Sequence, residues 1–492
     1  MSAQGIDVVA MAAPYAAKIA KATSARSGKG GTARGALVRR ALSNYFIGRT
    51  EDERTYLVAK EGPNIALFAA SAKAHLARQH RQATGQTVGR GALDEAWMNL
   101  EGDARDQPKT NLPLRVATTI EGHLVIDLAD PSGRAVVIAS DGWSVVDRSP
   151  VTFRRSRAML PLPGPERGGR VDELFNLLNV APALRDLFVA WLCSSLFSGL
   201  PHPAVVLRGE QGAAKSSTAK AMTYLIDPCM AATQKPPAND EDWAMTCSAR
   251  WIISVDNVSQ VQPWWSDALC RTVTGDGWLR RMLYTDDDIV ATSWRRCVIL
   301  NGITLGSSLR SDLGERLVFF DLHRPSVYLT ENEVQLQLDE MRARVLGALF
   351  DRAAQVLKAL PSTPIVRDLR MADFATFLTA HDDLTGGNAL AAYRRQLDDA
   401  FAEATEGDVI AMAVIDFMAT KSEWEGTASD LLVLLPAPLG KGYWPTTGSH
   451  LSQGLARSVT SLERVGISVS HGTGRGRRTI KLEKLPPAPG TP

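Results

Sequence analysis

The feature that most constrains the fold is a short glycine-bearing segment between an apolar stretch and a helical one. Residues 204–207 are apolar and β-prone, residues 217–225 have a helical pattern, and GEQGAAKS lies between them at 209–216. A strand, a glycine-bearing loop, a Lys-Ser pair and a helix in this order predict a phosphate-binding loop within an α/β sheet. Backbone N–H groups of such a loop and of the helix N-terminus point at phosphate oxygens.

The loop predicts ATP and Mg²⁺ as cofactors. Lys215 is expected to place its charge at the β- and γ-phosphates, and Ser216 to offer its hydroxyl to Mg²⁺. Ala214 stands where the consensus GxxxxGK[ST] has its last glycine, and we expect the loop to accept it because alanine is the next smallest residue. The predicted nucleotide-binding residues are Gly209, Glu210, Gln211, Gly212, Ala213, Ala214, Lys215, Ser216 and Ser217.

A second strand, at residues 251–255, ends in an acid. Asp256 at that end is expected to help hold Mg²⁺ through water. Read alone, it is an ordinary strand-end turn residue, and the upstream loop favours the metal role. Asn257 follows where many ATPases place a glutamate, which leaves the catalytic base open, with Glu210 and Glu315 as substitutes.

Two further elements follow in the chain. The apolar residues 297–300 end in Asn301, whose amide is expected to orient the attacking water. Arg316 immediately precedes the strand expected at 317–322, and it is the candidate to reach the nucleotide of a neighbouring subunit. The alternatives are a simple turn for Asn301 and a surface ion pair for Arg316.

These four elements, in this order, resemble the ATPase half of superfamily 3 helicases of the AAA+ class. Such proteins include phage, plasmid and poxvirus-type primase-helicases and ATP-binding proteins of bacterial mobile elements. The resemblance covers residues 201–325 well and 110–200 loosely. It implies Lys215 and Ser216 at phosphate and Mg²⁺, Asp256 at Mg²⁺, Asn301 as sensor, and Arg316 as a finger between subunits of a homo-oligomeric, hexameric ring.

Those helicases project a basic hairpin into the pore of the ring. The matching stretch here, at 274–284, makes Arg280 and Arg281 the candidates for DNA contact. An acidic triplet at 286–288 departs from the pattern, because like charge near a phosphate backbone costs affinity. An ordinary solvated hairpin is the alternative.

The C-terminal segment has its own pattern. Three helices between 409 and 465, followed by a basic hairpin at 467–482, resemble a winged helix. The third helix would then place Arg457 toward a major groove. The expected phosphate contacts of the wing are Arg475, Arg477 and Arg478. A protein-interaction module is the alternative.

Composition and charge limit the partners. The net charge of +2 excludes a globally basic nucleic-acid binder, although the first fifty residues carry eight Lys or Arg against Asp7 alone. The five cysteines form no CxxC pair, which favours a reducing compartment. The first residues lack the charged and apolar regions of a signal peptide, and the apolar runs are too short for a bilayer, so we expect a cytoplasmic protein without membrane contact.

The expected fold is α/β and multidomain, with a central AAA+ phosphate-loop sheet, a helical and β N-terminal region, and a C-terminal winged-helix domain. The expected parts are a basic, mainly helical region at 1–110, a β-rich domain at 111–165, a helical lead-in at 166–200, an ATPase core at 201–330, a helical region at 331–404, a winged-helix-like domain at 405–485 and a disordered tail at 486–492.

The expected function is an ATP-dependent, ring-forming DNA helicase or translocase in mobile-element replication. It would act on single-stranded or forked DNA, with a primase or an origin-binding protein as a further partner. The alternative is an AAA+ DNA-binding assembly or regulatory ATPase that does not unwind, which Ala214, Asn257 and the acidic triplet favour. A DNA-binding protein with an inactive nucleotide site is a third option.

Overall fold

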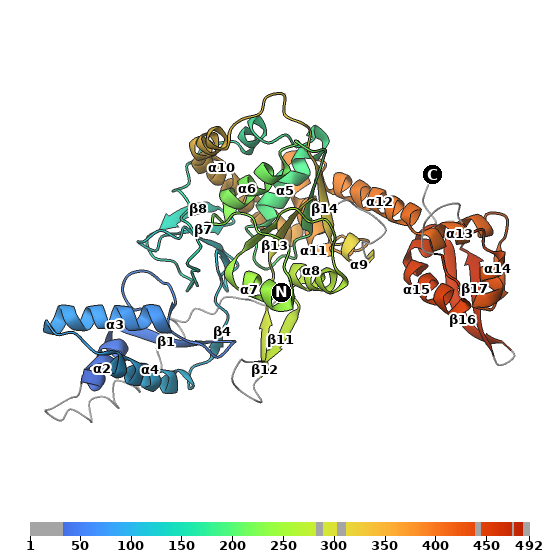
Figure 1. The fold of residues 1–492 in the computed structure, drawn as a ribbon. Coiled ribbons are helices and arrows are strands. Elements are labelled where there is room, and N and C mark those ends of the chain that lie inside the picture. Colours follow the sequence, from blue (N-terminus) through green and yellow to red (C-terminus); the bar gives the residue numbers. More distant parts are fainter. Residues whose placement is uncertain (1–32, 282–288, 303–310, 438–443, 475–476, 486–492) are drawn as a thin grey trace. The chain divides into compact units, whose positions relative to one another are not determined.

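A computed structural model describes residues 33–281, 289–302, 311–437, 444–474 and 477–485 (Figure 1). The chain divides into two compact units. The first comprises residues 1–259, 267–303 and 316–393, and the second comprises 260–266, 304–315 and 394–492. The expected disordered tail at 486–492 lies outside the described residues.

The N-terminal part of the first unit combines helices with a four-stranded sheet of order β3-β2-β1-β4. Its elements are α2 (Ala33–Asn44), β1 (Tyr45–Thr50), β2 (Thr55–Ala59), β3 (Leu67–Phe68), α3 (Ala69–Thr84), α4 (Arg90–Ala104) and β4 (Lys109–Thr110). Leu37, Leu57, Leu76 and Leu100 share one buried cluster between the helices and the sheet. The sheet was not expected from the sequence, which predicts a mainly helical region here.

An antiparallel meander follows, with strand order β5-β6-β7-β8. Its strands are β5 (Val116–Thr118), β6 (Leu124–Asp127), β7 (Ala135–Ala139) and β8 (Gly142–Val146). The turn between β6 and β7 is held by Asp130, whose Oδ1 accepts the N–H groups of Gly133 and Arg134 at 2.8 and 3.1 Å. Side-chain acceptors of this kind are what make Asp a turn residue.

The central sheet is parallel, with strand order β10-β13-β9-β14. Its strands are β9 (Ala204–Arg208), β10 (Ile252–Val255), β13 (Cys297–Asn301) and β14 (Leu317–Asp321). They are almost wholly buried, as apolar runs covered on both faces must be. This sheet and its helices confirm the predicted α/β class.

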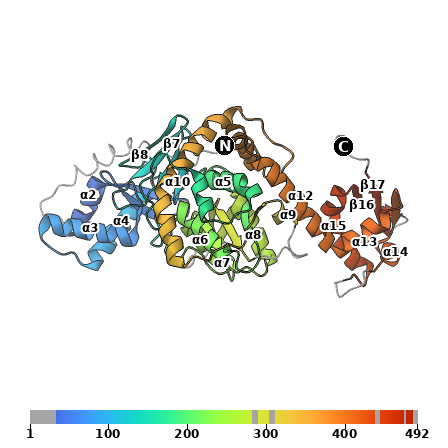
Figure 2. The ribbon, with the colours of Figure 1, turned by 90° about the horizontal axis from the view of Figure 1, so that it is seen from above.

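Further helices and a two-stranded hairpin occur between residues 171 and 385. They are the 3₁₀ helices η1 (Val171–Asn176) and η2 (Pro182–Leu184), then α5 (Arg185–Ser194), α6 (Lys215–Ile226), α7 (Asp240–Ala249), α8 (Pro263–Thr274), β11 (Gly277–Arg281), β12 (Ile289–Ser293), α9 (Ser311–Gly314), α10 (Glu331–Ala359), η3 (Leu360–Ser362) and α11 (Ala372–Thr385). Helix α6 packs on β9, β10 and β13, and α10 runs beside α5 and α6 (Figure 2).

The long helix α10 begins with a capping box and contains a glycine at a close crossing. Thr330 accepts the N–H of Glu333, and Glu333 in turn accepts the N–H of Thr330. Farther along, the N–H of Glu166 donates to the carbonyl of Ala343 at 2.9 Å. A Cβ added at Gly347 would lie 1.7 Å from the carbonyl oxygen of Glu166, so only glycine lets this segment lie against the helix.

We therefore expect Gly347→Ala to destabilise the protein. The added methyl group must displace backbone rather than a flexible side chain, and overpacking of this kind costs roughly 1–3 kcal/mol or more. Urea unfolding followed by circular dichroism measures the change. Gly102→Ala is the matched control, because Gly102 also lies in a helix and has no atom within 4 Å of the added Cβ. An unchanged midpoint for Gly347→Ala would contradict the close packing.

A fully buried ion pair joins the meander to the central sheet. Arg115 Nε donates to Asp227 Oδ1 at 3.0 Å, and the two side chains are 0% and 4% exposed. The remaining nitrogens of Arg115 donate to backbone carbonyls. Asp227 Oδ2 accepts the N–H groups of Trp251 and Ile252 at 2.9 and 3.1 Å, at the start of β10. Every charge in this group therefore has hydrogen-bond partners, which a buried charge requires.

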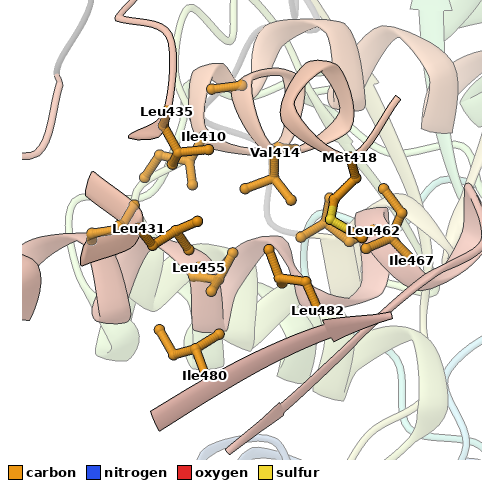
Figure 3. Packing of buried hydrophobic residues seen from close by; sticks show 13 residues of the cluster. Ile410, Val414, Met418, Leu431, Leu435, Leu455, Leu462, Ile467, Ile480 and Leu482 are labelled. Carbon is orange, nitrogen blue, oxygen red and sulfur yellow. The ribbon is translucent and has the colours of Figure 1, made fainter. Parts of the chain in front are cut away.

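The C-terminal part of the second unit has its own apolar core. Its elements are the end of α12 (Ala389–Gly407), then α13 (Val409–Met418), β15 (Glu423–Gly426), α14 (Ala428–Leu434), α15 (Gly448–Arg464), β16 (Ile467–Gly474) and β17 (Arg477–Lys484). Side chains from α13, α14, α15 and the strands converge in one cluster (Figure 3). The sheet has the order β15-β17-β16 and adds one strand to the expected hairpin.

Candidate nucleotide-binding site

The loop between β9 and α6 depends on three residues with positive φ. Gly209, Gly212 and Ala214 have φ values of 145°, 87° and 57°. A Cβ at Gly209 would lie 2.6 Å from the carbonyl oxygen of Leu322, so that position requires glycine. Ala214 has φ 57° and ψ 29°, a left-handed conformation that costs a non-glycine residue roughly 1–2 kcal/mol. The loop thus accepts alanine, but with backbone strain.

Ala214→Gly is accordingly expected to stabilise the protein by about 1 kcal/mol, because glycine adopts this conformation without strain. The greater conformational entropy of glycine in the unfolded chain offsets part of this gain. The midpoint of urea unfolding should rise. Ala213→Gly is the control, since Ala213 is buried and lacks a positive φ, and it should lower the midpoint. A fall in the midpoint for Ala214→Gly would contradict strain at this position.

Lys215 is the first residue of α6 and lies across the loop. Its Nζ donates to the carbonyl oxygens of Gly209 and Glu210 at 2.8 and 2.9 Å. These bonds hold the ammonium group at the N-terminal end of the helix, where the backbone N–H groups and the helix dipole already favour an anion. An ammonium group has three donors, so a further bond to a phosphate is available to it.

Three polar side chains from different elements meet beside the loop. Asp256 Oδ1 accepts hydrogen bonds from Ser216 Oγ at 3.2 Å and from Asn301 Nδ2 at 2.5 Å. Asn301 Nδ2 also donates to Ser216 Oγ at 2.9 Å. Because β9, β10 and β13 are parallel neighbours, their carboxyl ends bring the start of α6, Asp256 and Asn301 to one edge of the sheet.

This group leaves two acceptors available. All bonds to the Asp256 carboxylate among the described residues use Oδ1, including the N–H of Asn257 at 2.9 Å. Asn301 is 3% exposed, and its Oδ1 is buried without a hydrogen-bond partner in the described part of the chain. The hydroxyl of Ser216 and the carboxylate of Asp256 fit the chemistry of a Mg²⁺ site that water and phosphate oxygens complete, and the amide oxygen of Asn301 can accept a hydrogen bond from water.

Asn257 occupies a left-handed backbone position. Its φ is 59°, and its side chain is exposed. Gly302 lies against it, since a Cβ at Gly302 would be 3.2 Å from the Cα of Asn257. Asparagine is among the few residues that adopt this conformation readily, whereas glutamate does so rarely. The backbone conformation at residue 257 therefore favours asparagine over the glutamate that many ATPases have at this position.

The two alternative bases are each engaged in an ion pair. Glu210 Oε2 lies 3.0 Å from Arg324 Nε, at the loop itself. Glu315 belongs to the second unit, where its Oε1 lies 3.1 Å from Arg464 Nη2. Among the hydrogen bonds of the described residues, none joins Glu210 to Ser216, Asp256 or Asn301.

Arg316 lies at the opposite edge of the central sheet. Its carbonyl accepts the N–H of Ala204, the first residue of β9, whereas the loop follows the last residue of that strand. The side chain is 9% exposed, and its Nη1 lies 3.7 Å from Cys270 Sγ. The structure therefore does not bring Arg316 to the loop of its own chain, and a role at a nucleotide requires a neighbouring subunit.

The segment between β14 and α10 lies along the loop, which the sequence did not predict. Arg324 pairs with Glu210, and the hydroxyl of Tyr328 lies 2.9 Å from where a Cβ of Gly212 would be. At its far end Glu331 pairs with Lys220 of α6 at 2.6 Å. Tyr328 is 66% exposed. These contacts join residues far apart in the sequence. The sequence signal for them was only an aromatic residue, Tyr328, shortly before a capping box.

The candidate DNA contacts lie largely outside the described side chains. β11 and β12 form the expected antiparallel hairpin, with Arg280 and Arg281 opposite Val290 and Ile289. The side chains of Arg280, Arg281, Arg457 and Arg477, the whole of Arg475 and the acidic triplet 286–288 are outside the description. By backbone, Arg457 belongs to α15 and Arg477 begins β17. Arg478 is exposed on β17.

The sequence matches two related family models. Residues 171–403 match the replication protein of actinomycete integrative conjugative elements, and residues 410–490 match the C-terminal domain of that protein. Together these ranges take in more than half of the chain. The chain belongs to this family of replication proteins. The replication protein therefore pairs the loop, Asp256 and Asn301 in its first matched range with a separate C-terminal domain.

Other similarities are weak. Two apo structures of the NrS-1 C terminal region, the first of them in its A form, are 11% and 10% identical in sequence to the replication protein. Each covers 92% of this chain and 98% of its own, with TM-scores of 0.41 and 0.37. A likeness at this level carries no argument. No curated protein matches the sequence significantly. Within the described residues, no helix has both the length and the apolar character that crossing a bilayer requires.

Proposed function

We propose that this replication protein is an ATP-dependent, ring-forming DNA helicase or translocase of its mobile element. The observation that carries the proposal is the meeting of Ser216, Asp256 and Asn301 beside a loop that Lys215 crosses. A phosphate loop, one strand-end carboxylate and one strand-end amide are the parts that phosphoryl transfer from a nucleotide needs. Family membership supplies the replication context.

Each side chain has a distinct role in the proposed reaction. The N–H groups of the loop and α6 bind the phosphates, and Lys215 turns its ammonium group to the β- and γ-phosphates. Ser216 and the carboxylate of Asp256 would hold Mg²⁺, which would neutralise charge that develops on the phosphates. Asn301 would orient water through its buried Oδ1, which has no hydrogen-bond partner among the described residues. Positioning and charge stabilisation thus come mainly from fixed groups.

The finer proposals follow the resemblance to superfamily 3 AAA+ helicases. In a hexameric ring, Arg316 would complete the nucleotide site of the adjacent subunit after leaving its contact with Cys270. Arg280 and Arg281 on the β11–β12 hairpin would contact single-stranded or forked DNA. The C-terminal domain would act as a winged helix, with Arg457, Arg475, Arg477 and Arg478 at phosphates or bases. A primase or an origin-binding protein is the proposed further partner.

Asn257 favours a second candidate function. The position after the strand-end acid carries an amide on a left-handed backbone, and an amide is a poor general base. A replication protein of this kind could bind ATP to assemble on DNA and hydrolyse it slowly without unwinding. The two functions differ in whether hydrolysis is coupled to strand separation.

Two measurements test these proposals together. We expect single-stranded DNA to stimulate ATP hydrolysis by the full chain, and a forked duplex to be unwound only when ATP and Mg²⁺ are present. Turnover without strand displacement would leave the assembly ATPase as the function. An absence of any ATP turnover would overturn both.

A further inference from the structure

The segment after β8 carries Arg154 into contact with the N-terminal part of the first unit. Ile65 and Phe153 form a parallel bridge, and the N–H of Ala66 donates to the carbonyl of Phe153 at 2.9 Å. This pairing brings together residues far apart in the sequence. The guanidinium of Arg154 then lies 5.7 Å from the ring centre of Phe68, at the end of β3.

A second guanidinium lies at the same ring. Arg54, in the turn between β1 and β2, places its Cζ 4.8 Å from the ring centre of Phe68. Among the described residues, the carboxylate that favours the charge of Arg154 is Asp52, and Asp52 already lies 2.7 Å from Arg54 Nε. The neighbouring Glu53 pairs with Arg49 and Lys109. The acids of this turn are thus largely engaged with other cations.

Arg154 is left as a surplus cation. It is half-buried, and its guanidinium makes no hydrogen bond to any residue that the structure describes. Burial, and then the charge of Arg54, lower its pKa to about 10, and Arg296 acts in the same direction. It is still protonated at neutral pH. A partly buried cation that faces like charge costs stability, and such conflicts concentrate at sites that bind a ligand.

The position of Arg154 points to the ligand. Arg296, whose charge acts on Arg154, follows β12 of the hairpin that is proposed to contact DNA. We propose that Arg54 and Arg154 together bind one phosphate of a single-stranded DNA backbone. This inference rests on the DNA binding in the proposed function and adds a site outside the central sheet. Two planar guanidinium groups offer paired donors that match phosphate oxygens. Asp52 alone cannot accept the hydrogen bonds of both groups.

Binding of the full chain to a labelled oligothymidine at several salt concentrations tests the proposal. Arg154→Gln should weaken binding about tenfold, because a charge-assisted hydrogen bond is lost. It should also reduce the slope of log K against log salt by about 0.7, the value for one phosphate on single-stranded DNA. Arg54→Gln and the double variant should show the same slope change, because both residues hold one phosphate. Arg134→Gln is the matched control, since Arg134 is likewise half-buried but is paired with Asp130 at 2.6 Å.

Thermal stability separates ligand binding from a structural role. The melting temperature of Arg154→Gln should equal or exceed that of the wild type, because repulsion with Arg54 and Arg296 is removed. A loss of several degrees, or an unchanged salt slope in both single variants, would overturn the proposal.

Pyrophosphate competition adds a third readout: if Arg154→Gln abolishes pyrophosphate binding but leaves DNA binding intact, the ligand is a free phosphate and not DNA. A wild type that binds no DNA would overturn the proposed function as well.

Discussion

Replacement of Lys215 by alanine is expected to lower the rate of ATP hydrolysis by about 10²–10³-fold, the usual effect of removing one fixed charge-stabilising group. The ammonium group lies at the N-terminal end of α6 and is held there by two carbonyls of the loop. No other lysine or arginine among the described residues bonds to those carbonyls. A steady-state phosphate-release assay with saturating single-stranded DNA measures the change.

Lys220→Ala is the matched control for this experiment. Lys220 lies on the same helix, but its Nζ pairs with Glu331 on α10, away from the loop carbonyls. It should retain nearly full turnover, since an exposed ion pair contributes little. Equal turnover of Lys215→Ala and the wild type would remove the loop from the mechanism. An equal loss in both variants would point to damage to α6 and not to the reaction.

The largest expected effect on stability is that of Asp227→Ala. This change leaves the fully buried guanidinium of Arg115 without its counter-ion, and it frees the N–H groups of Trp251 and Ile252. Breaking a buried pair by removing one partner typically costs 3–5 kcal/mol. Urea unfolding followed by tryptophan fluorescence should show a much lower midpoint.

Two further variants complete this test. Asp227→Ala combined with Arg115→Met removes both charges, and it should recover part of the lost stability because no unpaired charge stays buried. Glu95→Ala breaks the exposed pair with Arg34 and should leave the midpoint unchanged. If the double variant is as unstable as the single one, the cost lies in the lost N–H acceptors and not in the charge.

The central sheet was predictable because its signals are local. Each parallel strand is a short apolar run, and each ends in a residue whose type is chemically informative, such as Asp256 or Asn301. Parallel strands share a carboxyl edge, so the order of these residues in the sequence was enough to bring them together. The winged-helix and ring interpretations stay predictions, since they depend on surfaces and partners beyond one chain.

Other features could not be read from the sequence because they depend on distant partners. The Arg115–Asp227 pair and the contact of Arg324 with Glu210 join residues more than a hundred positions apart. The sheet at the N-terminus uses strands as short as Leu67–Phe68, which give no periodic pattern. The burial of Arg316 against Cys270 is likewise a product of tertiary packing, since its sequence position predicts only a strand start.

The apolar core of the C-terminal part is drawn wholly from residues 410–482. Because the described residues of this cluster all lie within one short range of the chain, we expect this part to fold independently after separation. Recombination between related elements would then exchange this part as a single cassette and leave the sequence of the central sheet unchanged.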